Sequence, residues 1–361
     1  MFTFTNGKAH EQYVVPNGQY VIVNSKFISS DGFIRKYANK LICPLTKGDI
    51  VMVMSDVPNG KAMSKCFLID KNNTYTLNQR ICSLSNMDTP LFFLYQINRN
   101  KYFMKFDDGV SQTNLKKEDV LNCPIYSTIK DEREKISKFI SILDKRIQKQ
   151  QKLMDSLKSY KRGLLSLVFG NKFPNSILAE ILQKGKAGGT PQSSNSTYYN
   201  GNIPFLSISD ITEQGKYICY TEKHISEIGL QNSTAWIVPQ GSLILSMYAS
   251  YGLVAINKVP LATSQAMFNM VFNKDVNVEY IYYYLSYLAT TDYYTKMVST
   301  GTQPNLNAEK VKAIPIYLPS TVEQCYIVKL LQSYDNKLTK EELILTKLLS
   351  QKTALLQQLF I

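Results

Sequence analysis

The sequence predicts an α+β protein in which two tandem domains are separated by two long helices that pair as an antiparallel coiled coil, giving a pseudo-twofold internal repeat. Three observations predict this fold. Apolar residues recur at alternating steps of four and three over residues 130–169, which is the heptad spacing of a coiled coil. The pattern returns 191 residues later, at the end of the chain. At that offset, residues 112–169 share roughly eighteen identities with the second copy, where unrelated sequences would share about three or four, so the repeat is an internal duplication.

The polar layers of the two helices favour antiparallel pairing. A lysine interrupts the apolar seam in each copy, Lys161 in the first and Lys352 in the second. A parallel pair in register would stack these two charges in one layer. An antiparallel pair whose residue numbers sum to 495 instead places Lys161 near Tyr334 and Lys352 near Leu143, and it puts one domain at each end of the pair. The aliphatic stems can then carry the charges outward.

The residues expected to form this seam, and with it the docking faces for partner proteins, are apolar and lie at heptad spacing. They are Ile136, Ile140, Leu143, Ile147, Leu157, Ile327, Leu331, Leu338, Leu348 and Leu355.

Composition limits the possible functions. The formal net charge of +13 predicts an acidic partner, such as nucleic acid or an anionic membrane surface. Residues 130–162 hold eleven Lys or Arg against five Asp or Glu, which fits either a binding surface or a solvated helix face. Six cysteines without a Cys-x-x-Cys pair and two histidines give no recognisable zinc spacing, so no metal site is expected. The chain has no run of eighteen apolar residues and no signal peptide, and we expect a cytoplasmic protein.

In chain order, we expect a first domain at 1–121, a first helical region at 122–169, a second domain at 170–312 and a second helical region at 313–361. In the first domain, 20–24 and 49–55 read as strands, and 89–98 reads as a helix carried on one face of a strand-rich domain. In the second, residues 236–248 are expected to supply a strand pair. The run 279–288 matches the apolar run around Phe92.

The front ends of the two domains differ in length. Aligning Gly7-Lys8-Ala9 with Gly185-Lys186-Ala187 leaves about fifteen residues before Gly185 without a counterpart in the first domain. The first domain is therefore expected either to lack an opening element or to borrow one from elsewhere.

No catalytic motif is present. The sequence holds no Gly-x-Gly-x-x-Gly or phosphate loop, no Gly-x-Ser-x-Gly and no His-Glu-x-x-His. Asn122-Cys-Pro-Ile-Tyr126 is faintly similar to the Asn-Pro-Pro-Tyr loop of adenine methyltransferases, but its copy, Ala313-Ile-Pro-Ile-Tyr317, has no Asn. Both are interpreted as the turn into the following helix, because Pro favours helix entry. We expect a non-catalytic protein.

The duplicated motifs carry a family resemblance. They are Gly188-Gly-Thr-Pro191, Asp49-Ile-Val-Met-Val-Met-Ser55, Thr302-Gln-Pro-Asn-Leu306 and the helix starts Asp131-Glu-Arg133 and Val322-Glu-Gln324. With these motifs the chain closely resembles, over nearly its whole length, the specificity subunit of type I restriction-modification systems.

The resemblance implies a DNA-binding, non-enzymatic subunit whose two target-recognition domains each read one half of a bipartite, asymmetric double-stranded DNA site. It implies two methyltransferase subunits docked on the helices, with restriction subunits able to join them. S-adenosylmethionine, ATP and Mg are expected on those partners, and no cofactor is expected in this chain. Two alternatives remain open: the recognition subunit of a fused restriction-methylation enzyme of type II, and a coiled-coil scaffold that binds proteins without reading DNA.

Polar residues beside strand ends are the candidates for DNA contacts, because amide and guanidinium groups can bond base edges. Gln79 and Gln265 are favoured because both halves place Gln in the same setting. The full candidate set is Lys26, Ser30, Lys36, Ser55, Lys61, Gln79, Arg80, Ser209, Tyr248, Ser250, Gln265, Thr302 and Gln303.

Overall fold

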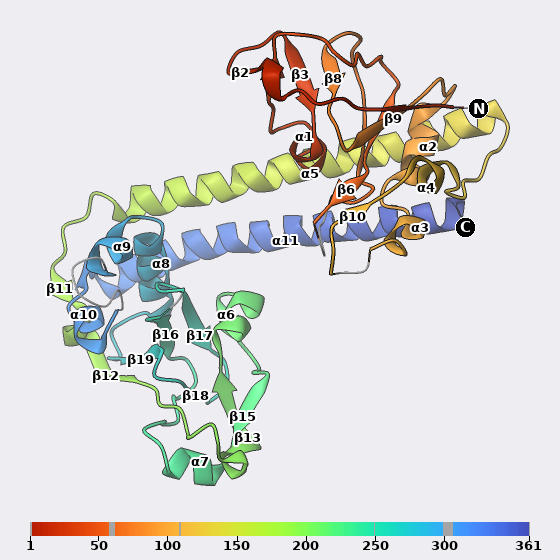
Figure 1. Ribbon diagram of the computed structural model, residues 1–361. Coiled ribbons are helices and arrows are strands. Elements are labelled where there is room, and N and C mark those ends of the chain that lie inside the picture. Colours follow the sequence, from red (N-terminus) through yellow and green to blue (C-terminus); the bar gives the residue numbers. More distant parts are fainter. Residues whose placement is uncertain (1, 58–61, 108–109, 249, 299–305, 361) are drawn as a thin grey trace. The chain divides into compact units, whose positions relative to one another are not determined.

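The structure is a computed structural model that describes residues 2–57, 62–107, 110–248, 250–298 and 306–360 (Figure 1). Its contacts divide the chain into two compact units. Unit 1 comprises Met1–Gln151 with Ile344–Ile361, and unit 2 comprises Lys152–Leu343. Each long helix therefore contributes one part to each unit.

Unit 1 is a strand-rich domain with short helices, and its fold class is the one predicted. Its strands are β1 (Thr3–Asn6), β2 (Val14–Val15), β3 (Tyr20–Val23), β4 (Tyr37–Ala38), β5 (Ile50–Val53), β6 (Ser55–Asp56), β7 (Cys66–Leu68), β8 (Tyr75–Leu77), β9 (Ile81–Ser85) and β10 (Thr113–Asn114). Its helices are the 3-10 helix η1 (Glu11–Tyr13), α1 (Ser25–Ser29), α2 (Pro90–Ile97), α3 (Lys101–Met104), α4 (Lys117–Leu121) and the first part of α5 (Lys130–Phe169).

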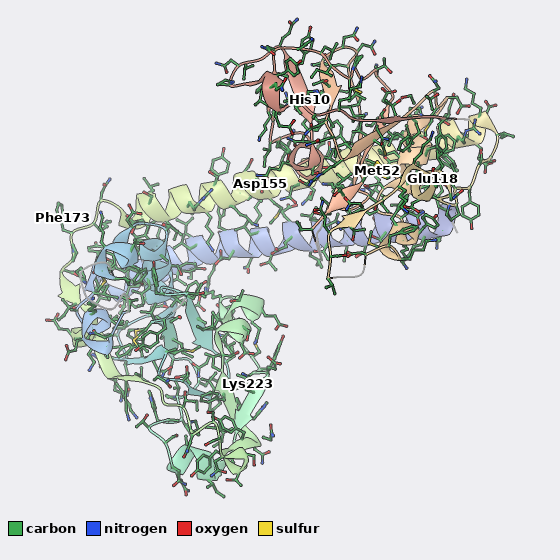
Figure 2. All side chains as sticks on the ribbon, viewed as in Figure 1. His10, Met52, Glu118, Asp155, Phe173 and Lys223 are labelled. Atoms are coloured by element: carbon green, nitrogen blue, oxygen red, sulfur yellow. The ribbon has the colours of Figure 1, made fainter. Side chains whose placement is uncertain are left out.

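Two four-stranded sheets organise unit 1, in the orders β1-β9-β5-β7 and β2-β4-β3-β8. Every residue of β5 is buried, so its continuous apolar run reflects a strand covered on both faces. Alternate side chains of β5 point to opposite faces and belong to two core clusters. Val51 and Val53 lie in one cluster, and Ile50 and Met52 lie in the other. Figure 2 marks Met52 among the side chains of unit 1.

Unit 2 repeats this plan with two more elements at its front. Its strands are β11 (Ser176–Ile177), β12 (Leu182–Ala187), β13 (Tyr199–Leu206), β14 (Tyr217–Ile218), β15 (Lys223–Ile225), β16 (Leu243–Ser246), β17 (Val254–Asn257), β18 (Ala262–Thr263), β19 (Met267–Phe272) and β20 (Pro315–Ile316). Its helices are η2 (Leu178–Ile181), η3 (Ser196–Tyr198), α6 (Ile208–Gln214), α7 (Glu227–Gln231), α8 (Val278–Ala289), α9 (Tyr293–Val298), α10 (Ala308–Lys312) and the first part of α11 (Thr321–Leu359).

The core of unit 2 lies between a five-stranded sheet, β12-β19-β16-β17-β14, and the helices. Tyr280 and Tyr283 of α8 are fully buried there, beside Leu165 and Phe169 of α5 and Leu331 of α11. The tyrosine-rich run therefore forms a core helix, as its match to α2 predicted.

Strand registers place the two halves in correspondence. Ile50 and Leu84 pair in unit 1 as Leu243 and Met270 do in unit 2. Phe4 lies opposite Leu84, and Gly185 lies opposite Met270. Phe4 therefore corresponds to Gly185.

In that register the counterpart of Gly7 is Gly188. The sequence alignment had paired Gly7 with Gly185, three residues earlier. In both glycines a Cβ would meet a backbone carbonyl oxygen, of Asn78 beside Gly7 and of Thr263 beside Gly188. Residues 171–181, which include β11 and η2, have no counterpart among the described residues of unit 1.

One sequence expectation requires correction. Residues 236–248 hold one strand, β16, because Val238 makes only an isolated bridge to Leu261. Pro239, directly after it, has no N–H to extend the ladder. Within the expected regions 122–169 and 313–361, the helices themselves begin at Lys130 and Thr321.

The helices pair antiparallel in each unit. In unit 1 the Lys352 ammonium lies 2.6 Å from Asp144, and in unit 2 the Lys161 ammonium lies 2.5 Å from Asp335. Both pairs of residue numbers sum to 496, one more than the register expected. All ten predicted seam residues are buried or half-buried. Within the described residues, no helix combines the length and apolar character needed to cross a membrane.

Candidate DNA-recognition and partner-docking surfaces

The turn that connects two neighbouring strands carries an exposed glutamine in each unit. Gln79 lies between β8 and β9, and Gln265 lies between β18 and β19. The strand registers make these two turns equivalent, because Ile81 and Met267 occupy the same position of the repeat. The structure therefore places the two favoured candidates in one setting.

Each of these side-chain amides is held by the segment that follows β1 in unit 1 or β12 in unit 2. Gln79 donates a hydrogen bond to Glu11 at 2.8 Å. Gln265 accepts one from the Thr190 hydroxyl at 2.5 Å. Gln79 bonds through its amide nitrogen and Gln265 through its amide oxygen. Gln79 therefore presents its amide oxygen to solvent, and Gln265 presents its amide nitrogen. Sequence reasoning did not name Glu11 or Thr190 as site residues, although Thr190 lies in the quoted Gly-Gly-Thr-Pro motif.

Arg80 lies beside Gln79 with a backbone φ of 67°, in the left-handed region. This conformation is costly for an arginine, and the backbone hydrogen bond from Met54 N–H to the Arg80 carbonyl helps to hold it. The side chain is exposed. The turn therefore presents a glutamine and an arginine next to each other to solvent.

The other candidates in unit 1 differ in accessibility. Lys26 and Lys36 are exposed. The Ser30 hydroxyl is occupied locally, because it donates to the Phe27 carbonyl and accepts from the Ile34 N–H. Ser55 is only 7% exposed and accepts a hydrogen bond from Gln112, which counts against a direct DNA contact there.

In unit 2, Ser209 is exposed on the first turn of α6 and shares a hydrogen bond with Ser207, the residue that caps that helix. Ser250 is exposed, whereas Tyr248 is half-buried and packs against the core. Three candidates, Lys61, Thr302 and Gln303, lie outside the described residues.

The helix pair carries the same three-residue polar layer in each unit. In unit 1 the Tyr95 hydroxyl donates to Asp144 at 2.7 Å, and Asp144 also pairs with Lys352. In unit 2 Tyr283, Asp335 and Lys161 make the same contacts, the first at 2.7 Å. Burial and the hydrogen bond to the carboxylate raise the pKa of both tyrosines well above its ordinary value. These tyrosines therefore stay neutral donors that tie α2 and α8 to the helices.

Unit 2 adds an ionic cluster to this layer. The Lys216 ammonium lies 2.7 Å from Glu279 and 3.0 Å from the Tyr283 hydroxyl, and the Tyr217 hydroxyl donates to Glu279 at 2.6 Å. Burial alone would raise the pKa of Glu279, but these donors outweigh it and hold the pKa below its usual value. Gln332 of α11 donates to the same carboxylate.

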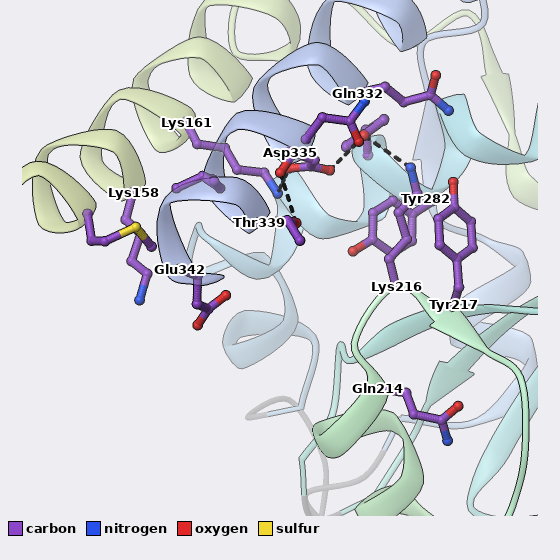
Figure 3. Close-up of a pocket in the computed structure, with 14 residues that line it drawn as sticks. Lys158, Lys161, Gln214, Lys216, Tyr217, Tyr282, Gln332, Asp335, Thr339 and Glu342 are labelled. Carbon is purple, nitrogen blue, oxygen red and sulfur yellow. Dashed lines mark hydrogen bonds and ion pairs between the residues drawn. The ribbon is translucent and has the colours of Figure 1, made fainter. Parts of the chain in front are cut away.

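The cluster borders a cleft of about 590 Å³, which Figure 3 shows with Lys161 and Lys216 on either side of Asp335. The charged groups of Lys161, Lys216, Glu279 and Asp335 are already paired with one another. The arrangement therefore anchors the β14 edge of the sheet to α11.

Apolar side chains are also exposed on the outer faces of the helices. In unit 1, Phe139 is 54% and Ile142 is 58% exposed, and both line an apolar groove with Leu355 of α11. In unit 2, Tyr326 and Leu330 are exposed on α11. An exposed apolar helix face of this kind is typical of a surface that binds another protein.

Comparisons with known proteins identify this arrangement. The family model described as "Type I restriction modification DNA specificity domain" matches residues 1–158 and 172–348. The MjaIX specificity subunit of Methanocaldococcus jannaschii is 31% identical over 150 residues, which cover 41% of this chain and 35% of that protein. The HindI specificity subunit of Haemophilus influenzae is 30% identical over 134 residues, 37% of this chain and 29% of that protein. The matches thus span about a third of the length of these relatives.

Solved structures share the fold. The S subunit of the type I restriction-modification system from M. genitalium superposes with a TM-score of 0.60 at 18% identity, covering 100% of this chain and 94% of that one. A chain from a study of complex assembly in the type I restriction-modification system also gives 0.60, at 14% identity with 99% and 97% coverage.

Proposed function

Because the chain belongs to the type I restriction modification DNA specificity domain family, we propose that it is the sequence-reading subunit of a type I restriction-modification complex. Each unit reads one half of a bipartite, asymmetric site in double-stranded DNA. The chain itself performs no chemistry, and the methylation and restriction that it directs are carried out by partner subunits.

The observation that carries this proposal is the duplicated glutamine turn. A glutamine amide can bond adenine in bidentate fashion in the major groove, and an adjacent arginine can take guanine. Unit 1 offers both groups at Gln79 and Arg80, whereas unit 2 has Ala266 in the place of Arg80. Equivalent scaffolds with different side chains predict two different half-sites.

The net charge of +13 supports the DNA-binding part of the proposal, since phosphate neutralisation supplies most of the non-specific affinity of DNA-binding proteins. The exposed apolar faces around Phe139 and Leu330 support the partner part. A chain with an internal repeat offers two similar docking faces, which suits two copies of one methyltransferase subunit. S-adenosylmethionine, ATP and Mg then belong to the partners, and restriction subunits are able to join the complex.

The test is to co-express the chain with its methyltransferase partner and map methylated adenines across the host genome. We expect one bipartite motif. Replacing residues 185–310 by the matching segment of a relative should change one half of that motif and leave the other unchanged, because the two units have separate cores. The same complex carrying Phe139→Ser should lose partner association, whereas Lys36→Ser, an exposed change away from the helices, should not.

Two results would overturn the proposal. One is methyltransferase, nuclease or ATPase turnover by the purified chain alone. The other is a segment exchange that alters both halves of the motif.

A further inference from the structure

The two glutamine turns are built on the same backbone scaffold. In unit 1 the Gly7 N–H donates to the Ile81 carbonyl at 2.9 Å, and in unit 2 the Gly188 N–H donates to the Met267 carbonyl at 3.1 Å. The residue after each glycine donates to the last residue of the strand before the turn, at 3.1 Å in unit 1 and 2.9 Å in unit 2. The glutamines therefore start from equivalent backbone, and a difference in what they present must come from the side chains around them.

In unit 1 a buried histidine fixes the segment that faces the turn. The Lys8 carbonyl accepts from the Gln79 N–H at 3.0 Å, and Nδ1 of His10 lies 2.6 Å from the same carbonyl. The other ring nitrogen, Nε2, lies 2.7 Å from the Thr76 hydroxyl, and the ring is 1% exposed. A carbonyl oxygen only accepts, so Nδ1 carries the hydrogen of that bond. The next residue, Glu11, begins the 3-10 helix η1 and is therefore held beside the turn.

The carboxylate of Glu11 determines how the Gln79 amide is turned. Its Oε1 accepts from the Gln79 nitrogen Nε2 at 2.8 Å, and both side chains are exposed. A carboxylate can only accept hydrogen bonds, so the amide meets it with the nitrogen and leaves the oxygen outward. The reversed amide would bring two acceptor oxygens together and would lose a charge-assisted hydrogen bond. Glu11 thus gives the turn a fixed polarity.

Unit 2 has the opposite polarity on the same scaffold. Counting from the equivalent glycines, the position of Glu11 is taken by Gln192. The group that holds Gln265 is instead the Thr190 hydroxyl, which donates to the amide oxygen at 2.5 Å and leaves the nitrogen outward. The group that each turn presents is thus set by a neighbouring segment and not by the glutamine itself.

An exposed glutamate beside this turn lowers the general affinity for DNA. It repels phosphates at a place where a lysine or arginine would neutralise them and strengthen non-specific binding. Its contact with Gln79 also contributes little to folding, because water competes for hydrogen bonds between exposed side chains. Selectivity between bases is therefore the property that this contact improves.

Resting on the proposed function, we propose that Glu11 is a positioning residue that restricts the base read by unit 1. The outward oxygen of Gln79 accepts from an exocyclic amino group in the major groove, at N6 of adenine or N4 of cytosine. Guanine and thymine present the carbonyl oxygens O6 and O4 at this edge, and these oppose the amide oxygen. The position read by Gln79 therefore holds adenine or cytosine. The outward nitrogen of Gln265 is matched by an acceptor such as guanine O6 or thymine O4.

The test uses the complex of the full chain with its methyltransferase partner and duplexes that carry the mapped methylation motif. The exchange of residues 185–310 identifies, as the unchanged half of the motif, the half-site that unit 1 reads. Each base pair of that half is replaced by the other three, and competition binding gives the relative affinities. At one position, adenine or cytosine on the contacted strand should bind at least about fivefold better than guanine or thymine, which is the worth of one hydrogen bond.

Glu11→Ala should reduce that preference by about fivefold at this one position. The half-site read by unit 2 is an internal control, because its preferences should not change. Glu118→Ala removes the same charge from an exposed position of unit 1 and should leave every base preference unchanged. An unchanged preference in Glu11→Ala would overturn the role of Glu11, and so would a uniform loss of affinity for every duplex.

The direction of the amide is checked by exchanging the two side chains. In the double variant Glu11→Gln with Gln79→Glu, the introduced amide donates to the introduced carboxylate, whose second oxygen still faces outward. We expect the preference for adenine or cytosine to be retained. Its loss would show that Gln79 reads the base through its nitrogen, which a glutamate lacks, and would overturn the proposal. Absence of any sequence preference in the wild-type complex would instead contradict the proposed function itself.

Discussion

The ion pair between Lys352 and Asp144 offers a quantitative test of helix pairing in unit 1. The two charged groups lie 2.6 Å apart, and their side chains are 29% and 26% exposed. Unit charges about 4 Å apart attract by about 4 kcal/mol at an effective dielectric constant of 20, before desolvation. Solvent screening and the ordering of two side chains reduce exposed pairs to about 1 kcal/mol or less. We therefore expect a coupling of about 1 kcal/mol for this partly buried pair.

The perturbations are Lys352→Met, Asp144→Asn and the double variant. Methionine keeps most of the aliphatic stem of the lysine, so its effect isolates the charge. Asparagine keeps an oxygen that can still accept from the Tyr95 hydroxyl. Urea denaturation gives the free energy of unfolding of each variant, and the double-mutant cycle yields the coupling.

The matched control is Lys347→Met, at an exposed position on the same helix. We expect it to change the free energy of unfolding by less than about 0.5 kcal/mol. A coupling below about 0.3 kcal/mol, or an equal effect of Lys352→Met and Lys347→Met, would refute the view that this layer fixes the antiparallel register.

Three further results are expected. The pKa of Glu279 is lower than its ordinary value of 4.5, so the ionised carboxylate stabilises the folded chain above that pH, and this stabilisation is lost as the pH falls through the folded pKa. Thermal denaturation should therefore show that Glu279→Gln is less stable than wild type at pH 7. The difference should shrink below about pH 4. Gln265→Ala should relax base choice at one position of one half-site by about 1–3 kcal/mol in binding assays of the complex, whereas Gln183→Ala, at an exposed glutamine outside the candidate set, should not. Inserting seven residues after Gln151 and seven after Leu343 lengthens both helices and preserves the heptads. Seven residues of helix span about 10 Å, so the gap in the mapped methylation motif should lengthen by about three base pairs. An unchanged gap would contradict a spacing role for the helices.

The helices could be predicted well because their signal is local and long. The heptad pattern gave the bounds of α5, Lys130–Phe169, as the structure has them. It also gave the antiparallel direction, since the two lysines could not share a layer. The aspartates that pair with these lysines were missed because Asp144 and Asp335 lie beside the apolar seam. Their tyrosine partners come from elements about fifty residues away, at Tyr95 and Tyr283.

The structural setting of the candidate residues could be predicted only where the repeat supplied a second observation. Gln79 and Gln265 lie in equivalent turns, as their matching contexts indicated. Ser55 had no such support. Ser55 follows a buried strand, but β10 pairs with it and Gln112 donates a hydrogen bond to its hydroxyl. β10 lies more than fifty residues further along the chain, and strand propensity carries no information about such pairings.

What the two copies keep and what they change suggests how the repeat is used. Both keep the Tyr–Asp–Lys layer that ties α2 or α8 to the helices. The Lys216–Glu279 cluster is confined to unit 2, because the position equivalent to Glu279 is Leu91. A difference that close to the sheet alters how the β14 edge is held. If the proposed function holds, identical partners would dock on both copies while the two turns read different bases.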